Sequence, residues 1–163
     1  IVEAESSREL LEYGKALSSQ SLPKGDNLAV VTNAGGPGVI TSDEISERGL
    51  ELAKFSDKTL SELEEAMPDE FTPGNPIDVI GDAGHRRYED AIDAVLEDEA
   101  VDAVIVLLTP QANTEIEKTA KVIANAAEES EKPLMPCFMG SADVSKGVKI
   151  LSDRELQIGR AHV

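Results

Sequence analysis

The chain alternates short runs of apolar, β-branched residues with longer stretches in which apolar residues recur every three or four positions. This alternation predicts strands that are buried on both faces and amphipathic helices that cover them. The apolar runs predict strands at 28–32, 50–55, 101–108 and 132–139. The periodic stretches predict helices at 6–19, 37–48, 57–67, 88–96, 114–128 and 143–151. Residues 71–84 are rich in Gly and Pro, so we expect a long loop that crosses an edge of the sheet.

The order of these elements indicates the fold class. A strand that returns parallel to the one before it needs a crossover connection, and each predicted helix is long enough to supply one. We therefore expect an α/β protein with a three-layer, flavodoxin-like (Rossmann-like) fold, in which helices cover both faces of a parallel sheet. Residues 1–157 are predicted to form a single domain, because the hydrophobic content of 40% is sufficient for one core.

The two ends of the sequence suggest a piece of a longer gene. The chain begins at Ile1, inside a stretch with a helical pattern. Residues 158–163 match the in-frame translation of a common sequencing adapter, and we expect them to be a non-native tail. His162 and Arg160 therefore receive no functional role.

Charge and composition exclude several classes of protein. The chain has 32 acidic and 15 basic residues, a net charge of -17, and no basic cluster longer than Arg86 and Arg87. Nucleic-acid binders need a basic surface, and a membrane-spanning helix needs about 20 apolar residues. We expect a soluble, cytoplasmic protein with neither partner. Cys137 is the single cysteine, so no internal disulfide forms, and we expect an inert thiol in an apolar strand.

The first candidate site follows the first predicted strand, because ligands of parallel sheets bind at the carboxyl ends of the strands. Asn33, Gly35, Gly36 and Gly38 stand where the next helix begins. The first amides of a helix are unpaired and carry about half a positive charge, so bare backbone here suits a phosphate or another anion. The alternative is a tight turn without a ligand, since the spacing is neither GxGxxG nor a P-loop.

Two further loops are expected at the carboxyl ends of the strands. Thr109, Gln111 and Ala112 follow the central strand and would direct a second helix start toward the same ligand, although an ordinary capped turn explains them equally well. Asn75 and Asp78 form a candidate ligand loop, but an Asp in a turn most often bonds its own backbone.

No catalytic or metal-binding residue is predicted from the remaining sequence. His85 follows a glycine without a neighbouring nucleophile or metal-like spacing, which favours a surface position. The sequence contains no zinc spacing, no nucleophile elbow and no recognisable Ser, His and Asp constellation.

Four segments together resemble one enzyme family. They are ALSSQSLPKG at 16–25, VTNAGGPG at 31–38, NPID at 75–78 and LLTPQA at 107–112. In these segments the chain is similar to the ADP-forming acyl-CoA synthetases, the acetate-CoA ligase branch of the succinyl-CoA synthetase superfamily. The resemblance spans the chain to about Gly140. It implies the C-terminal flavodoxin-like ligase domain of the alpha subunit or alpha-like region.

The resemblance also implies a reaction and a set of partners. Acyl-CoA, ADP and phosphate would give the acid, CoA and ATP through an acyl phosphate and a phosphohistidine, which makes the enzyme an acid-thiol ligase. The helix starts after Thr32 and after Gln111 would then hold the phosphohistidine. The CoA-binding, phosphohistidine and ATP-grasp domains would be fused or separate partners, and CoA, ADP or ATP and Mg would bind to the full enzyme, none of them to this domain itself.

The chain departs from that family in one respect. The family's histidine lies in a Ser-His-Thr-Gly-like segment, which is absent here, and neither His85 nor His162 matches it. We therefore expect no turnover from this chain alone. An alternative is a synthetase-like, acyl-CoA-sensing regulatory domain of a protein lysine acetyltransferase. A third is a free-standing binding module for a phosphorylated small molecule.

The acidic excess predicts a salt-dependent stability, as in a protein adapted to a salty cytoplasm. Raising KCl from about 0.1 M to about 1 M shortens the Debye length from about 10 Å to about 3 Å, which screens repulsion among the carboxylates. The free energy of unfolding, measured by denaturant titration at each salt concentration, should therefore rise. A stability that stays level or falls would remove the idea of salt adaptation.

Overall fold

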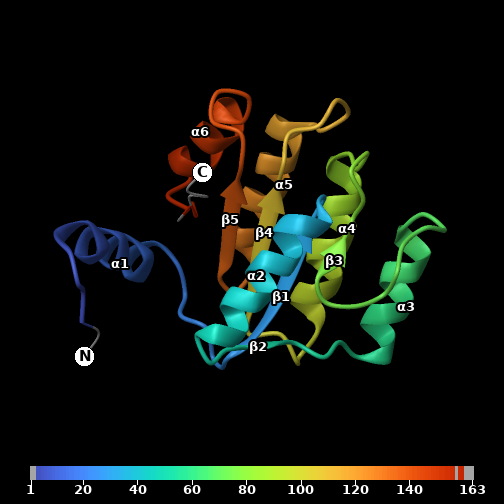
Figure 1. Ribbon diagram of the computed structural model, residues 1–163, viewed down its shortest axis with the longest axis horizontal. Helices are drawn as coiled ribbons and strands as arrows, with labels where there is room; N and C mark the ends of the chain where they lie inside the picture. Colours follow the sequence, from blue (N-terminus) through green and yellow to red (C-terminus); the bar gives the residue numbers. More distant parts are fainter. Residues whose placement is uncertain (1–2, 157, 160–163) are drawn as a thin grey trace.

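A parallel sheet lies at the centre of the molecule (Figure 1). The computed structural model describes residues 3–156, 158 and 159. Its strands are β1 (Asn27–Thr32), β2 (Glu51–Leu52), β3 (Ile77–Asp78), β4 (Ala103–Leu108) and β5 (Leu134–Phe138). Its helices are α1 (Ser7–Ser19), α2 (Gly35–Glu47), α3 (Asp57–Ala66), α4 (His85–Glu97), α5 (Ile116–Glu129) and α6 (Ser145–Asp153). The strand order is β2–β1–β4–β5, and the short β3 also pairs with β1.

The predicted α/β fold is confirmed, with changes at the ends of elements. Helix α2 begins at Gly35 rather than at Pro37, and α5 begins at Ile116 rather than at Thr114. The strand expected at 50–55 has only two paired residues. The predicted loop at 71–84 was wrong in one part, because it contains β3. Two residues are too few for an alternating pattern to reveal a strand.

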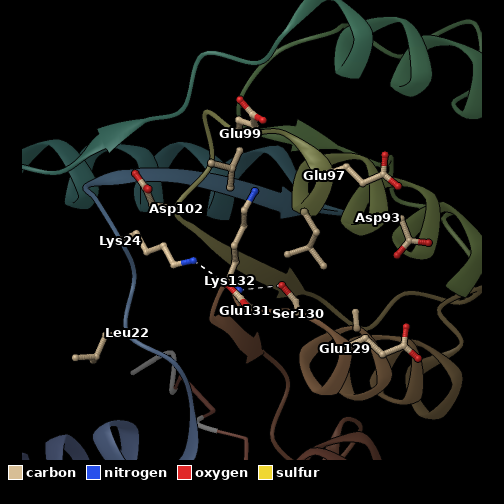
Figure 2. Close-up of a pocket in the computed structure, with 13 residues that line it drawn as sticks. Leu22, Lys24, Asp93, Glu97, Glu99, Asp102, Glu129, Ser130, Glu131 and Lys132 are labelled. Carbon is tan, nitrogen blue, oxygen red and sulfur yellow. Dashed lines mark hydrogen bonds and ion pairs between the residues drawn. The ribbon is translucent and has the colours of Figure 1, made fainter.

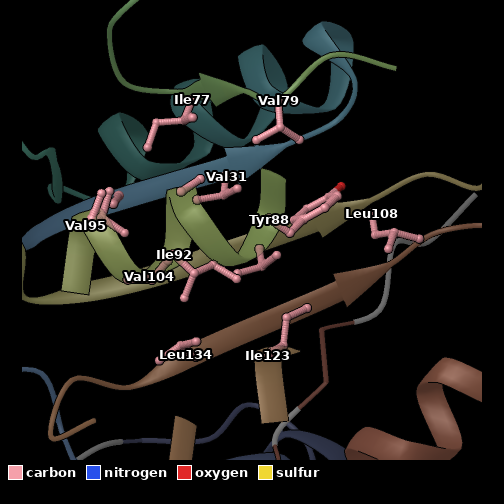
Figure 3. Packing of buried hydrophobic residues seen from close by; sticks show 14 of the residues in the cluster. Val31, Ile77, Val79, Tyr88, Ile92, Val95, Val104, Leu108, Ile123 and Leu134 are labelled. Carbon is pink, nitrogen blue, oxygen red and sulfur yellow. The ribbon is translucent and has the colours of Figure 1, made fainter. Parts of the chain in front are cut away.

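The helices form two layers of unequal size (Figure 1). Helix α2 packs on β1 and β2 from one side, while α3, α4, α5 and α6 pack against one another on the other side. Side chains alternate along β4, so Val104 and Val106 face the larger layer and Leu107 faces α2. Figure 3 shows Tyr88 and Ile92 of α4 packed among these strands. Each large apolar side chain that is fully buried stabilises the fold by about 1.5–3 kcal/mol.

Helix α1 stands apart from both layers (Figure 1). Ser6 caps its start, since the Ser6 hydroxyl accepts a hydrogen bond from the Glu9 amide at 3.1 Å. The side chains of Leu10 and Leu11 are exposed. No helix in the described part of the chain is both long and apolar enough to cross a membrane.

Asn75 completes the edge of the sheet between β2 and β3. Its amide nitrogen donates to the carbonyl oxygens of Leu28 at 2.7 Å and Ala53 at 3.1 Å. Its amide oxygen accepts from the Val30 amide at 3.0 Å. The side chain therefore takes the place of a peptide group on the side of β1 that faces away from β4, in the gap between its pairing with β2 and its pairing with β3. This matters because buried backbone groups need partners.

Glu115 ties the start of α4 to the start of α5. Its Oε2 atom accepts from the His85 backbone at 3.3 Å and lies 2.6 Å from the His85 Nδ1 atom. Its Oε1 atom lies 2.6 Å from the Lys118 ammonium. Lys118 and His85 together lower the pKa of Glu115 from 4.5 to about 2. The side chain of His85 is 26% exposed, and its partner is Glu115.

Replacing Asn75 by Ala should destabilise the fold. The change removes the partner of the Val30 amide and the Asn75 hydrogen bonds to the Ala53 and Leu28 carbonyls, of which the Leu28 carbonyl keeps the Ala53 amide as a donor. The expected loss is about 2–4 kcal/mol in the free energy of unfolding, measured by urea titration. Asn125→Ala is the control, because Asn125 is exposed on α5. Equal effects at the two positions would contradict the role given to Asn75.

Replacing Glu115 by Gln should lower the melting temperature at neutral pH. A carboxyl group whose pKa is depressed on folding stabilises the protein above its unfolded pKa, and this contribution is lost as pH falls through the folded pKa. For Glu115 the loss falls between about pH 4.5 and about pH 2. The difference in melting temperature between wild type and variant, followed by circular dichroism, should shrink across that range.

The control for this pH series is Glu64→Gln, which removes one negative charge from an exposed position on α3. It reports the general effect of lowering the net charge. If both variants differ from the wild type with the same pH dependence, the contacts of Glu115 do not contribute to stability.

Candidate functional site

The loops after β1 and β4 leave the sheet from the same edge. The two strands are parallel neighbours, and Thr32 is paired with Leu107. Asn33, only 1% exposed, joins the loops. Its Oδ1 atom accepts from the Thr109 amide at 2.9 Å and from the Thr109 hydroxyl at 3.0 Å, and its Nδ2 atom donates to the Thr109 carbonyl at 2.8 Å. The carboxyl ends of β1 and β4 are therefore held together.

Gln111 extends this link. Its Nε2 atom donates to the Asn33 carbonyl at 3.2 Å, while its backbone amide donates to the Thr114 hydroxyl at 2.9 Å. The amides of Thr109 and Gln111 are thus engaged within the protein, and Ala112 lies exposed in the turn before α5. We expect Asn33, Thr109 and Gln111 to shape the site rather than to touch a ligand, which differs from the direct role expected from the sequence.

Gly35 and Gly36 open helix α2, and both are exposed. Ala34, the N-cap residue, provides no side-chain hydrogen bond to the helix start. The first amides of a helix have no partner within the helix, and Pro37 has no amide hydrogen. The amides of Gly35 and Gly36 therefore stand at the positive end of the helix dipole. A Cβ atom at Gly36 would meet no heavy atom within 4 Å, so the space beside it is open.

Gly38 serves the fold instead. It is buried, and its amide donates to the Ala34 carbonyl at 3.3 Å. A Cβ atom at this position would lie 3.1 Å from the Thr32 methyl carbon and 3.5 Å from the Pro76 Cβ atom. Gly38 thus lets α2 pack closely on β1 and the β3 loop, and the predicted anion site narrows to Gly35 and Gly36.

In the ligand loop predicted from the sequence, the polar side chains bond mainly to backbone groups of the protein. Asn75 completes the sheet edge, as described above. The Oδ1 atom of Asp78 accepts from the Ile80 amide at 2.9 Å, which confirms the favoured turn role of this residue. Its Oδ2 atom lies 3.6 Å from the position that a Cβ atom of Gly35 would occupy. An anion is therefore better placed at Gly36 than beside Asp78.

Tyr88 bonds the backbone near the end of β4, a contact that the sequence did not predict. Its buried hydroxyl donates to the Leu107 carbonyl at 2.9 Å. Burial raises the pKa of Tyr88 well above its usual value of 10, and the nearby charge of Asp78 raises it further. The hydroxyl therefore remains a neutral donor beneath the strand ends. The sequence predicted a helix that begins at Tyr88 but could not show which carbonyl the Tyr88 hydroxyl would meet.

A groove of about 650 Å³ lies at the opposite edge of the sheet, between the ends of α4 and α5 (Figure 2). Its lining contains the carboxylates of Asp93, Glu97, Glu99, Asp102, Glu129 and Glu131. Lys24 pairs with Glu131 at 2.8 Å, and Lys132 donates to the Asp98 carbonyl at 2.6 Å. Carboxylates repel an anionic ligand, so this groove does not compete with the glycine turn for phosphate.

The described residues contain no candidate metal centre. Among residues 3–156, 158 and 159, no group of three or more His, Cys, Asp and Glu side chains is arranged to hold a metal ion. Cys137 lies half-buried in β5, and Gly159 forms a bridge with it. Of the predicted tail, Ile158 packs against the core, while residues 160–163 lie outside the described residues.

Comparison with known proteins gives consistent matches. The family described as "Ligase-CoA domain" matches residues 28–159. The chain is 36% identical to acetate–CoA ligase [ADP-forming] I of Archaeoglobus fulgidus, over 93% of this chain and 21% of the relative. It is also 36% identical to the alpha subunit of acetate–CoA ligase [ADP-forming] II of Pyrococcus furiosus, over 88% of this chain and 32% of the relative.

Solved structures agree with these sequence matches. The dinucleotide forming acetyl-coenzyme A synthetase 1 of Candidatus Korarchaeum cryptofilum, solved in complex with phosphate and ADP, superposes with a TM-score of 0.87 and 31% identity. This match covers 98% of the present chain and 35% of that chain. The present chain thus spans about a fifth to a third of the length of these relatives. By its sequence and its fold, the chain belongs to the Ligase-CoA domain family, and its matched relatives include ADP-forming acetate–CoA ligases.

Proposed function

We propose that this chain is the ligase domain of an ADP-forming acyl-CoA synthetase and that it stabilises the phosphohistidine intermediate of that enzyme. The full enzyme converts acyl-CoA, ADP and phosphate to the acid, CoA and ATP. The observation that carries the proposal is the pair of exposed glycines, Gly35 and Gly36, at a helix start without a side-chain cap. The match to ADP-forming acetate–CoA ligases supports it.

The chemistry of the site suits a phosphoryl group. Such a group carries about -1.5 to -2 charges near neutral pH and offers three acceptor oxygens. Each favourable contact with a helix start contributes about 0.3–1 kcal/mol at the surface and up to about 2 kcal/mol when partly buried. The donors at Gly35 and Gly36 are neutral, so they orient the group without a fixed cation that would have to be displaced during transfer.

The remaining parts of the reaction belong to other domains in this proposal. A CoA-binding domain, a domain that carries the histidine and an ATP-grasp domain would be the partners, fused or as separate subunits. CoA, ADP or ATP and Mg²⁺ would bind there, and this chain alone would not turn over. The matched relatives are ligases, so they give no support to a regulatory role in a protein lysine acetyltransferase.

The proposed anion site can be tested with inorganic phosphate. Titration into the ¹⁵N-labelled chain should shift the amide resonances of Gly35 and Gly36. Gly36→Asp should weaken phosphate binding by about tenfold or more, because a carboxylate in the helix's first turn takes the place of the anion and repels it. The same carboxylate stabilises a helix start, so the variant should remain folded.

Gly14→Asp is the matched control, since a Cβ atom at Gly14 in α1 also meets no heavy atom within 4 Å. It adds the same charge away from the site and should leave phosphate affinity unchanged. The proposed site is wrong if both variants weaken binding equally, or if phosphate shifts only resonances elsewhere in the chain.

A further inference from the structure

One face of the sheet is covered by helices over only half of its width. Successive residues of β5 alternate between buried and half-buried. Leu134 and Phe138, which are buried, belong to the core under the larger helix layer. Met135 and Cys137, which are half-buried, face the side of α2. In the described part of the chain, α2 packs on this side mainly against β1 and β2, so the half formed by β4 and β5 lacks a similar cover.

This uncovered half is apolar, and we call it the open face. Its half-buried side chains are those of Ile105, Met135, Cys137 and Met139. Parallel sheets occur almost only with both faces covered, because their strands consist of continuous apolar runs. The open face therefore needs a further apolar element to complete the second layer.

Helix α1 has a complementary surface. Leu10 is 64% exposed, Leu17 is 57% exposed and Tyr13 is 39% exposed. Their spacings of three and four residues place them along one side of the helix. Residues 7–19 contain two acidic and two basic side chains, so this helix has no net charge within a chain of net charge -17. An isolated helix of this length is only marginally stable in water, so α1 also needs a packing partner.

The end of α1 is already held beside the open face. Gln20, the C-cap residue, accepts a hydrogen bond through its side-chain oxygen from the Leu134 amide at 3.1 Å. Figure 1 shows α1 at the β5 edge of the sheet. The pKa of Arg48, at the end of α2, is raised chiefly by its hydrogen bond with Glu44 and to a smaller extent by Tyr13. Tyr13 therefore lies within electrostatic range of the α2 side. A change of backbone angles next to Gln20 is sufficient to lay α1 on the open face.

The helix and the strand match in length and in register. The 13 residues of α1 span about 20 Å, and the 5 residues of β5 span about 17 Å. With Gln20 fixed at Leu134 and α1 antiparallel to β5, about seven residues of helix cover the same 10 Å as about three residues of strand. The apolar side chains then fall opposite one another in the pairs Leu17 with Met135, Tyr13 with Cys137 and Leu10 with Met139.

We propose that α1 is a hinged strap that closes over the open face and completes the helix layer beside α2. Closure removes Leu10, Tyr13 and Leu17 from water together with the half-buried side chains of the sheet, and this burial of apolar surface drives it. The two methionines adapt their shape to the helix, because an unbranched side chain fills irregular gaps. The structure shows the strap in its open position.

A second copy of this chain is a poorer cover for the open face. Two copies would each bring a net charge of -17, and their carboxylates would repel one another at ordinary salt concentrations. Helix α1 is uncharged overall and is tethered at Gln20, so its effective concentration at the open face is high. The two covers predict different outcomes in the experiments below.

The first test measures how fast N-ethylmaleimide labels Cys137, the single cysteine, which lies on the open face. Labelling, followed by mass spectrometry, should be about tenfold faster in Leu10→Ser/Leu17→Ser than in wild type, because serine weakens the packing of the strap. Ile40→Ser is the matched control, since Ile40 is 70% exposed on α2. It should label at the wild-type rate. Circular dichroism checks that each variant keeps its fold.

The second test examines the register and leaves the leucines of the strap in place. In Tyr13→Cys, a short bis-maleimide should link the introduced thiol to Cys137 within one chain. Lys15→Cys is the control, because two residues correspond to about 200° around the helix axis, and it should link about tenfold more slowly. The strap is refuted if the double serine variant labels at the wild-type rate, if Ile40→Ser labels equally fast, or if the two linking rates are equal. Links that form between chains, in a dimer detected by sedimentation, would refute it in favour of a second copy.

Discussion

The arrangement of the candidate site depends on the bond network between Asn33 and Thr109. Three hydrogen bonds from one buried amide side chain join the ends of β1 and β4. Both ends belong to neighbouring parallel strands, so their loops would otherwise separate as each turns toward its own helix. With the loops joined, the start of α2 is fixed against the turn before α5. The exposed amides of Gly35 and Gly36 are thus held by a rigid base, as an anion site requires.

Polar residues near the sheet edges serve the backbone more than they serve a ligand. Asn75 replaces a missing strand neighbour, Asp78 closes its own turn, and Glu115 caps the start of α4. Each satisfies backbone groups that burial would otherwise leave without partners. A pair of glycines, which have no polar side chain, remains open to a ligand. Bare backbone can approach a phosphoryl group more closely than backbone that bears side chains.

The two edges of the sheet differ in electrostatic character, and this difference agrees with the family assignment. Carboxylates crowd the groove at the amino ends of the strands, where burial and neighbouring carboxylates raise the pKa of Asp93. The first two turns of α2, at the other edge, carry no charge. For the proposed phosphoryl site, the start of α2 is the less acidic of the two edges, with the carboxylate of Asp78 as its nearest negative group.

The sequence by itself determined the fold and pointed to the strand ends as the candidate site. Continuous apolar runs and a period of three to four residues depend only on which side chains face the core, so they predicted the parallel sheet, its covering helices and the strand ends with their glycine turn. The tertiary structure decided which polar atoms were already engaged. Asn33, Gln111 and Gly38 are residue types that suit a ligand site. In the structure, the side chain of Asn33 bonds Thr109, the side chain of Gln111 bonds Asn33, and Gly38 packs against Thr32 and Pro76. Hydrogen bonds and steric contacts act over a few ångströms in space, whatever the separation along the chain, and only the folded arrangement brings those partners together.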